Sequence, residues 1–354
     1  MKYIKQVSFF LIFITLSSIL FSQTKTGVTL FTDGGTTSLR GMSIPSDDVI
    51  WVSGSRGTVG KSIDAGKSWN WMIVPKYELS DFRDIEAFDS LTAINMAIGN
   101  PGIILKTKDG GKNWKKVFYK EMKEMFLDGM DFKDNKTGIC IGDPFYIGSS
   151  GKKYFYMLRT EDGGDTWEEL PAYKLAPVQQ PDGEAIFAAS GTSVQFLKHP
   201  DYEFAFVSGG KMSNLYLMAR EGKQSKVMNI PINQGVETTG TFSFATDGLK
   251  KFYCIGGDYK EPYNQYDNYY FTNDEGKKWG TPNISPPFGY RSCIRIVNEK
   301  TMVACGTNGV DFTKDGGKEW INGSTVGFNV CMVSPKSKTV YLAGDKGRVG
   351  KLIY

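Results

Sequence analysis

Five copies of one eight-residue box constrain the fold of this chain more than any other feature. Each copy fits the pattern S/T-x-D-x-G-x-x-W, and the copies begin at Ser62, Thr107, Thr160, Thr272 and Thr313. Successive box aspartates are separated by 45, 53, 112 and 41 residues. The longest interval therefore predicts two units, one of which lacks its box. Internal repeats with periods in this range are typical of propeller blades.

Two further repeats accompany the boxes. A short β-rich run that ends in glycine, such as "VIWVSG" at Val49 or "FYCIGG" at Phe252, occurs seven times. Upstream of each lies an apolar or alternating run, such as "FRDIEAF" at Phe82. Runs of this length and pattern predict strands. The sequence thus predicts one all-β domain over residues 23–354, a seven-bladed propeller of four-stranded antiparallel blades.

The two ends of the chain predict how the ring closes. The C-terminal stretch "VYLAGDKGRVGKLIY" repeats "IWVSGSRGTVGKSID" from the first unit and then stops, one strand short of a blade. A spare strand, "TGVTLF" at Thr26, precedes the first complete unit. We expect this N-terminal strand to complete the last blade, because that pairing removes the open edge.

The first 22 residues have the pattern of a secretory signal peptide. Lys2 and Lys5 precede an apolar run that is shorter than a membrane span, and the small Ser22 suits cleavage. We therefore expect an exported protein, periplasmic or secreted, with no membrane span in the mature chain. Removing the two lysines reduces the 42 basic residues to 40, against 38 acidic ones. This near-neutral balance argues against a nucleic-acid partner.

The five cysteines lack C-x-x-C spacing, and the chain has one histidine, His199, which precedes a proline at a predicted turn. This inventory predicts neither a zinc cluster nor another cofactor. We expect buried thiols that act as small apolar side chains. A hairpin disulfide between Cys293 and Cys305 is the alternative.

The boxes themselves are predicted to be structural. The aspartate can accept backbone N–H bonds across a hairpin turn, the glycine permits positive φ, and the tryptophan can pack between blades. A calcium loop would need several more oxygen ligands. The residues in these roles are Asp64, Trp69, Asp109, Trp114, Asp162, Trp167, Asp274, Trp279, Asp315 and Trp320.

The boxes resemble the Asp-box, or bacterial neuraminidase, repeat of sialidase-like propellers. Longer phrases such as "IGDPF" at Ile141 and "GEAIFAASGTS" at Gly183 resemble exported Bacteroidetes proteins related to the photosystem II assembly and stability factor family. Such proteins are also grouped as YVTN-like propellers and sometimes catalogued as oxidoreductases. The resemblance implies a seven-bladed propeller and, for photosynthetic members, a partner-binding assembly role. The chain has no G-x-G-x-x-G segment to support a redox cofactor.

Propeller topology predicts two different faces. The innermost strands begin on the face that also carries the loops between second and third strands, whereas the boxes lie on the opposite face. The first face is predicted to gather arginines, acids and a loop tyrosine as a binding surface. These residues are Arg40, Arg83, Arg291, Asp143, Glu184, Asp258 and Tyr259. We expect a monomeric, non-catalytic module that binds an envelope protein or a carboxylated or glycan ligand.

Two alternatives stay open from the sequence. The arginines and acids could pair with one another as a buried belt that holds the blades together. Alternatively, a sialidase-like glycosidase would clamp a carboxylate with the arginines and use Tyr259 as nucleophile, with Glu184 or Asp143 as acid or base. Sialidases usually carry an F/Y-R-I-P segment, however, and here "LRGMSIP" separates Arg40 from Pro45.

Overall fold

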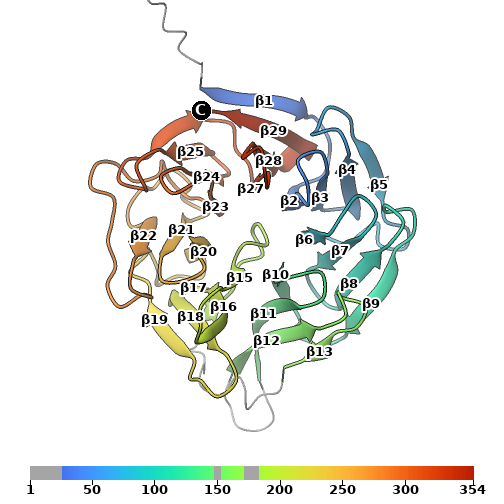
Figure 1. Ribbon diagram of the computed structural model, residues 1–354, viewed down its shortest axis with the longest axis horizontal. Coiled ribbons are helices and arrows are strands. Elements are labelled where there is room, and N and C mark those ends of the chain that lie inside the picture. The colour runs from blue at the N-terminus through green and yellow to red at the C-terminus, as the bar shows by residue number, and fades with distance from the viewer. Residues whose placement is uncertain (1–25, 147–152, 171–182) are drawn as a thin grey trace, which may run out of the picture.

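The computed structural model describes residues 26–146, 153–170 and 183–354, and the predicted signal peptide lies outside them. Seven antiparallel sheets surround a central axis, as Figure 1 shows. This confirms the predicted seven-bladed, all-β propeller. Nearly all regular elements in the described ranges are strands. None of the described residues forms a helix long and apolar enough to cross a bilayer.

Each blade begins with its innermost strand. Blade 1 contains β2 Leu39–Ser43, β3 Ile50–Gly54, β4 Thr58–Ser62 and β5 Asn70–Ile73. Blade 2 contains β6 Phe82–Ala87, β7 Ala93–Ala97, β8 Gly102–Thr107 and β9 Lys115–Lys120. Blade 3 contains β10 Leu127–Phe132, β11 Gly138–Tyr146, β12 Lys153–Thr160 and β13 Glu168–Glu169.

Blades 4 to 6 account for the long interval without a box and the unit after it. Blade 4, which has no box, contains β15 Val194–Phe196, β16 Tyr202–Val207, β18 Asn214–Ala219 and β19 Lys226–Asn229. Blade 5 contains β20 Thr239–Thr246, β21 Phe252–Asp258 and β22 Tyr269–Thr272, and two short strands, β17 Gly209–Gly210 and β14 Glu184–Ala185, extend its inner edge. Blade 6 contains β23 Cys293–Ile296, β24 Met302–Gly306, β25 Gly309–Thr313 and β26 Ile321–Ser324.

Blade 5 departs from the four-strand plan at its outer edge. A single bridge between Phe271 and Gly280 stands where the other blades have a fourth strand. The ring of Phe271 packs over Gly280, and a Cβ added at this glycine would collide with that ring. The outer strand is thus reduced to one backbone contact with β22.

Blade 7 closes the ring. It contains β27 Val330–Val333, β28 Val340–Gly344, β29 Arg348–Ile353 and, from the other end of the chain, β1 Gly27–Thr32. A 3-10 turn, η2 Asp345–Gly347, joins β28 to β29. Gly27 pairs with Ile353 and Leu30 with Gly350, in an antiparallel ladder. Figure 1 shows the blue β1 beside the red β29, and this pairing confirms the predicted N-terminal closure.

The five boxes repeat one hydrogen-bond pattern. In the second box the Thr107 hydroxyl accepts from the Gly111 N–H at 2.9 Å and donates to Asp109 at 2.9 Å. Asp109 in turn accepts from the Asn113 N–H at 2.9 Å. The equivalent bonds recur in the other four boxes. In each box, the hydroxyl oxygen and the aspartate carboxylate therefore both accept hydrogen bonds from backbone N–H groups of the turn.

The boxes also connect neighbouring blades. The Trp114 ring meets Trp51 of blade 1 edge-on at 6.5 Å, and the Trp320 ring meets Tyr269 of blade 5 at 5.3 Å. A lysine adds a polar link, since the Lys61 ammonium of blade 1 donates to the Gly110 carbonyl in the blade 2 box at 3.0 Å. Each of these contacts joins a box to the preceding blade.

A pair of adjacent glycines in the last box tests how tightly this turn is packed. Gly316 and Gly317 both have positive φ, +81° and +89°. A Cβ at Gly316 would meet open space, whereas one at Gly317 would collide with the Tyr269 hydroxyl. Urea denaturation should show Gly316→Ala costing about 1 kcal/mol for the backbone conformation, and Gly317→Ala at least about 1 kcal/mol more from overpacking. Equal losses would contradict the predicted packing of this box against blade 5.

Candidate functional site

The face on which the innermost strands begin is called the mouth face here, and the opposite one the box face. In blade 1, Leu39 pairs with Gly54, at the start of β2 and the end of β3. Ser62 of the box pairs with Ile50, at the far end of β3. The boxes and the predicted arginines therefore lie at opposite ends of the strands.

A loop of residues 186–193, called the plug here, reaches the axis on the mouth face. Figure 1 shows a yellow-green loop ahead of β15 that points to the middle of the ring. Two of the predicted arginines hold it, because Arg83 donates to the Ala188 carbonyl at 3.0 Å and Arg40 to the Ala189 carbonyl at 3.4 Å. These two bonds tie the plug to blades 2 and 1.

Hydroxyl groups hold the other side of the plug. The Ser190 hydroxyl donates to the Ser292 carbonyl of blade 6 at 2.7 Å, and the Thr192 hydroxyl lies 2.6 Å from that of Ser243 in blade 5. Ser190 and Thr192 are buried. The plug thus contacts four blades through polar groups.

The three predicted arginines have three different environments. Arg291 is fully buried and forms an ion pair of 2.6 Å with Asp311. Arg83 is half-buried and pairs with Asp81 at 2.7 Å. Arg40 is also half-buried, and within the described ranges no carboxylate lies at ion-pair distance from it. The expectation that all three reach the channel mouth is therefore wrong for Arg291.

Burial and a neighbouring cation both act against the charge of Arg40. Burial lowers the pKa of this guanidinium from its ordinary value, and the nearby charge of Arg83 lowers it further. Both effects disfavour the cation and would be relieved by an anion. The charges of Asp345 and Asp81 act in the opposite direction and raise this pKa.

The three predicted acids do not pair with these arginines. Glu184 is 3% exposed, and its carboxylate accepts from the Tyr216 hydroxyl at 2.8 and 2.9 Å and from the Asn214 amide at 2.8 Å. Asp143 accepts from the Ile186 N–H at 3.0 Å, and burial raises its pKa to about 6. Asp258 accepts from the Lys260 N–H in its own turn. The alternative of an ion-pair belt among these six residues is thus not found within the described ranges.

Aromatic rings extend from the plug to the exposed loop of blade 5. Phe187 stacks on Phe242 with 3.8 Å between ring centroids. Phe242 meets Tyr290 edge-on at 4.8 Å and Tyr259 at 6.2 Å. Tyr259 is 45% exposed, and Tyr263 in the same loop is 79% exposed. The sequence predicted Tyr259 at this face, whereas nothing in the residue pattern indicated the plug that supports it.

Below the plug, acidic side chains line the channel. Asp84 is 2% exposed and lies against Gly191 at the tip of the plug. It accepts from the Met130 N–H at 2.7 Å. Burial raises the pKa of Asp84 to about 8 and that of Asp131 to about 6. The channel therefore holds protons that exposed carboxyl groups would release.

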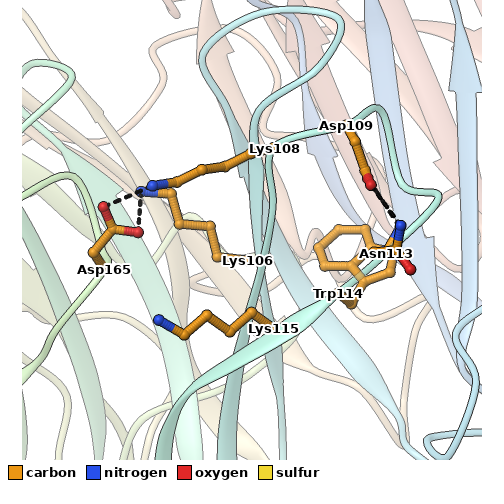
Figure 2. A pocket seen from close by; sticks show the side chains of 7 residues that line it. All are labelled: Lys106, Lys108, Asp109, Asn113, Trp114, Lys115 and Asp165. Atoms are coloured by element: carbon orange, nitrogen blue, oxygen red, sulfur yellow. Dashed lines mark hydrogen bonds and ion pairs between the residues drawn. The ribbon is translucent and has the colours of Figure 1, made fainter.

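A hollow of about 330 Å³ lies on the box face between blades 2 and 3. Figure 2 shows Lys106 and Lys108 both pointing at Asp165, with Lys115 beside them. Asp165 pairs with the two lysines at 3.1 and 2.9 Å, and the Lys106 ammonium also donates to the Gly163 carbonyl. Two ammonium groups thus share one carboxylate, and the charged groups of this hollow belong to the box turns of blades 2 and 3 and the strands beside them.

Comparisons with known proteins place this geometry in context. A model of the family described as photosynthesis system II assembly factor YCF48 matches residues 36–123. Photosystem II assembly lipoprotein Ycf48 from Synechococcus sp. (strain CC9902) is 26% identical over 125 residues. That match spans about a third of each protein, 33% of this chain and 32% of the relative.

Solved structures share the fold over nearly the whole chain. One described as YCF48 bound to D1 peptide has a TM-score of 0.63 and 17% identity, covering 94% of this chain and 96% of that one. YCF48 from Cyanidioschyzon merolae has a TM-score of 0.62, also at 17% identity, with coverage of 92% and 98%. At these identities the likeness establishes a common propeller architecture.

The different arginine environments predict different stability losses. Arg291→Met leaves Asp311 buried without its partner, which should cost about 3–5 kcal/mol. Arg83→Met breaks a partly exposed ion pair and one bond to the plug, and should cost about 1 kcal/mol. Chemical denaturation of both variants checks this. A similar loss for the two would contradict the contrast in burial.

The buried acids predict a pH dependence. The pKa of Asp84 is raised to about 8, so the folded protein keeps a proton that the unfolded chain has lost above about pH 4. Stability must therefore fall as the pH rises from about 4 to about 8, by up to about 1.4 kcal/mol per pH unit for this group. Urea denaturation from pH 5 to 8 should show this slope, and Asp84→Asn should reduce it. An unchanged slope in the variant would contradict the assignment.

Proposed function

We propose that this chain is a non-catalytic binding module that holds an extended, carboxylate-bearing segment of a protein partner on its mouth face. The observation that carries the proposal is the environment of Arg40. This guanidinium is half-buried beside a second arginine and has no carboxylate at ion-pair distance in the described ranges. A ligand carboxylate would supply the missing charge through charge-assisted hydrogen bonds.

The surroundings of Arg40 suit a peptide. The plug offers a rigid floor that four blades hold in place, so little ordering would be needed on binding. Exposed Tyr259 and Tyr263 provide amphipathic rings beside the cation, and such side chains are enriched at protein interfaces. Arg83, which keeps its own partner Asp81, would position the plug and contribute charge.

The comparisons support a protein partner of this kind. The neighbour described as YCF48 bound to D1 peptide has the same propeller architecture, and its description refers to a bound peptide. For this chain we propose an envelope protein as the partner. Export is proposed as well, on the basis of the predicted signal peptide of residues 1–22 and of the relative described as a lipoprotein.

The glycosidase alternative has less support. Its predicted acid, Glu184, is 3% exposed and bonded to Tyr216 and Asn214, whereas a general acid must reach the proton it transfers. Tyr259, the predicted nucleophile, packs near Phe242 in the exposed loop of blade 5. Release of a fluorophore from an aryl sialoside by the purified protein, abolished in Glu184→Gln, would contradict the non-catalytic proposal.

A matched pair of arginine variants tests the binding proposal. Fluorescence anisotropy with a library of labelled acidic peptides would identify a binding sequence and its Kd. Arg40→Ala should raise that Kd at least about tenfold, the minimum expected for a lost charged hydrogen bond. Raising the salt concentration should weaken wild-type binding, because the contact is between charges.

Arg220→Ala is the control, because it removes the same charge from the box face. Arg220 is half-buried and bonds to the His199 and Leu197 carbonyls. This variant should bind the selected peptide as the wild type does. Binding that Arg40→Ala leaves unchanged, or that Arg220→Ala weakens equally, would overturn the proposal.

A further inference from the structure

Three cysteines from two blades meet beside the channel. Cys293 on β23 and Cys305 on β24 are directly opposed in the blade 6 ladder. Cys331 lies on β27, the innermost strand of blade 7, with its Sγ 3.6 Å from that of Cys293. The three sulfur atoms all lie within 4.8 Å of one another, and all three residues are fully buried free thiols.

This spacing matches a three-coordinate metal. A metal–thiolate bond of about 2.3 Å in a flat, three-ligand site separates the sulfurs by about 4 Å. The sulfur atoms are held near that distance before any ligand arrives, because each cysteine lies on a strand paired within its own blade, β23 with β24 in blade 6 and β27 with β28 in blade 7. A disulfide, by contrast, would require two of them to approach to about 2 Å.

The available ligands favour a soft, monovalent ion. Zinc sites are almost always tetrahedral and would need a fourth ligand. The one histidine of the chain, His199, lies 3.4 Å from Glu275 at the boundary of blades 4 and 5. Among the described residues the cluster contains no carboxylate. Thiolates without nitrogen or oxygen ligands select Cu(I) over harder ions.

Side chains beside the three cysteines can stabilise the negative charge of thiolate ligands. The Thr192 hydroxyl of the plug lies 3.8 Å from the Cys293 sulfur and can donate to a thiolate. Arg295, two residues along β23, donates to the Met332 sulfur at 3.1 Å.

We propose that Cys293, Cys305 and Cys331 form a buried three-thiolate site that binds one Cu(I) ion and links blade 6 to blade 7. Binding releases the thiol protons, so affinity rises with pH. The ion would stabilise the closed ring, because its three ligands come from strands on both sides of a blade boundary. This proposal is independent of the peptide proposed for the mouth face.

The test is a Cu(I) titration of the reduced, full-length protein in competition with a chromophoric Cu(I) chelator, without oxygen. The wild type should withdraw one equivalent of Cu(I) from the chelator, and its Tm should rise on binding. Cys331→Ala should weaken binding at least about tenfold, the smallest loss expected when even an outer partner of a metal is removed. Circular dichroism of each variant would confirm that it folds.

Cys254→Ala is the matched control, because Cys254 is equally buried in blade 5 but lies outside the cluster. It should bind one equivalent as the wild type does. Failure of the reduced wild type to withdraw Cu(I) would overturn the proposal. So would equal binding by Cys331→Ala and wild type, or an equal loss in Cys254→Ala.

Discussion

The pairing of β1 with β29 is the interaction on which the rest of the structure depends. A propeller of this kind has no helix or second sheet to cover an open blade edge, and an unpaired edge strand is a site for aggregation. The ladder from Gly27–Ile353 to Leu30–Gly350 fixes the first and last strands to each other. Blade 7 is thereby completed from both ends of the chain, and the ring of blades around the innermost strands is closed.

Convergence of the innermost strands creates the two features to which we assign function. On the mouth face, carbonyl groups of the plug meet Arg40 and Arg83, so backbone from a distant part of the chain is held by cations from the first two blades. At the boundary of blades 6 and 7, the same convergence brings three thiols together. The box face, by contrast, is built from turns in which the box hydroxyl and aspartate already have hydrogen-bond partners.

Segments that recur from blade to blade could be predicted from the sequence, whereas the segments that occur once could not. The boxes and glycine-ended runs recur in register with the blades, so their count predicted the fold and the closing strand. The plug consists mostly of small residues in a single copy, and its role depends on partners from blades far away in the sequence. Likewise, Arg291 was expected at the mouth because its position along the strand resembles that of Arg40. Its partner Asp311, on β25, becomes a neighbour only through strand pairing.

The cysteines illustrate the same limit. Their spacing lacks the short-range patterns by which metal sites are recognised in sequences. Cys293 and Cys305 could be paired from the predicted hairpin, but Cys331 belongs to another blade. Only the radial packing of innermost strands places its sulfur 3.6 Å from that of Cys293. Because the three cysteines come from two blades, no local pattern in the sequence indicates that they lie together.

We have proposed that a protein partner binds the mouth face, whereas the box face has a structural role. Photo-crosslinking in the cells that produce the protein tests it most directly, with a benzophenone amino acid in place of Tyr259 or, on the box face, of the similarly exposed Lys108. We expect a discrete protein adduct from position 259 that disappears when Arg40→Ala is added, and none from position 108. Adducts formed from position 108, or adducts at 259 that are indifferent to Arg40, would contradict it.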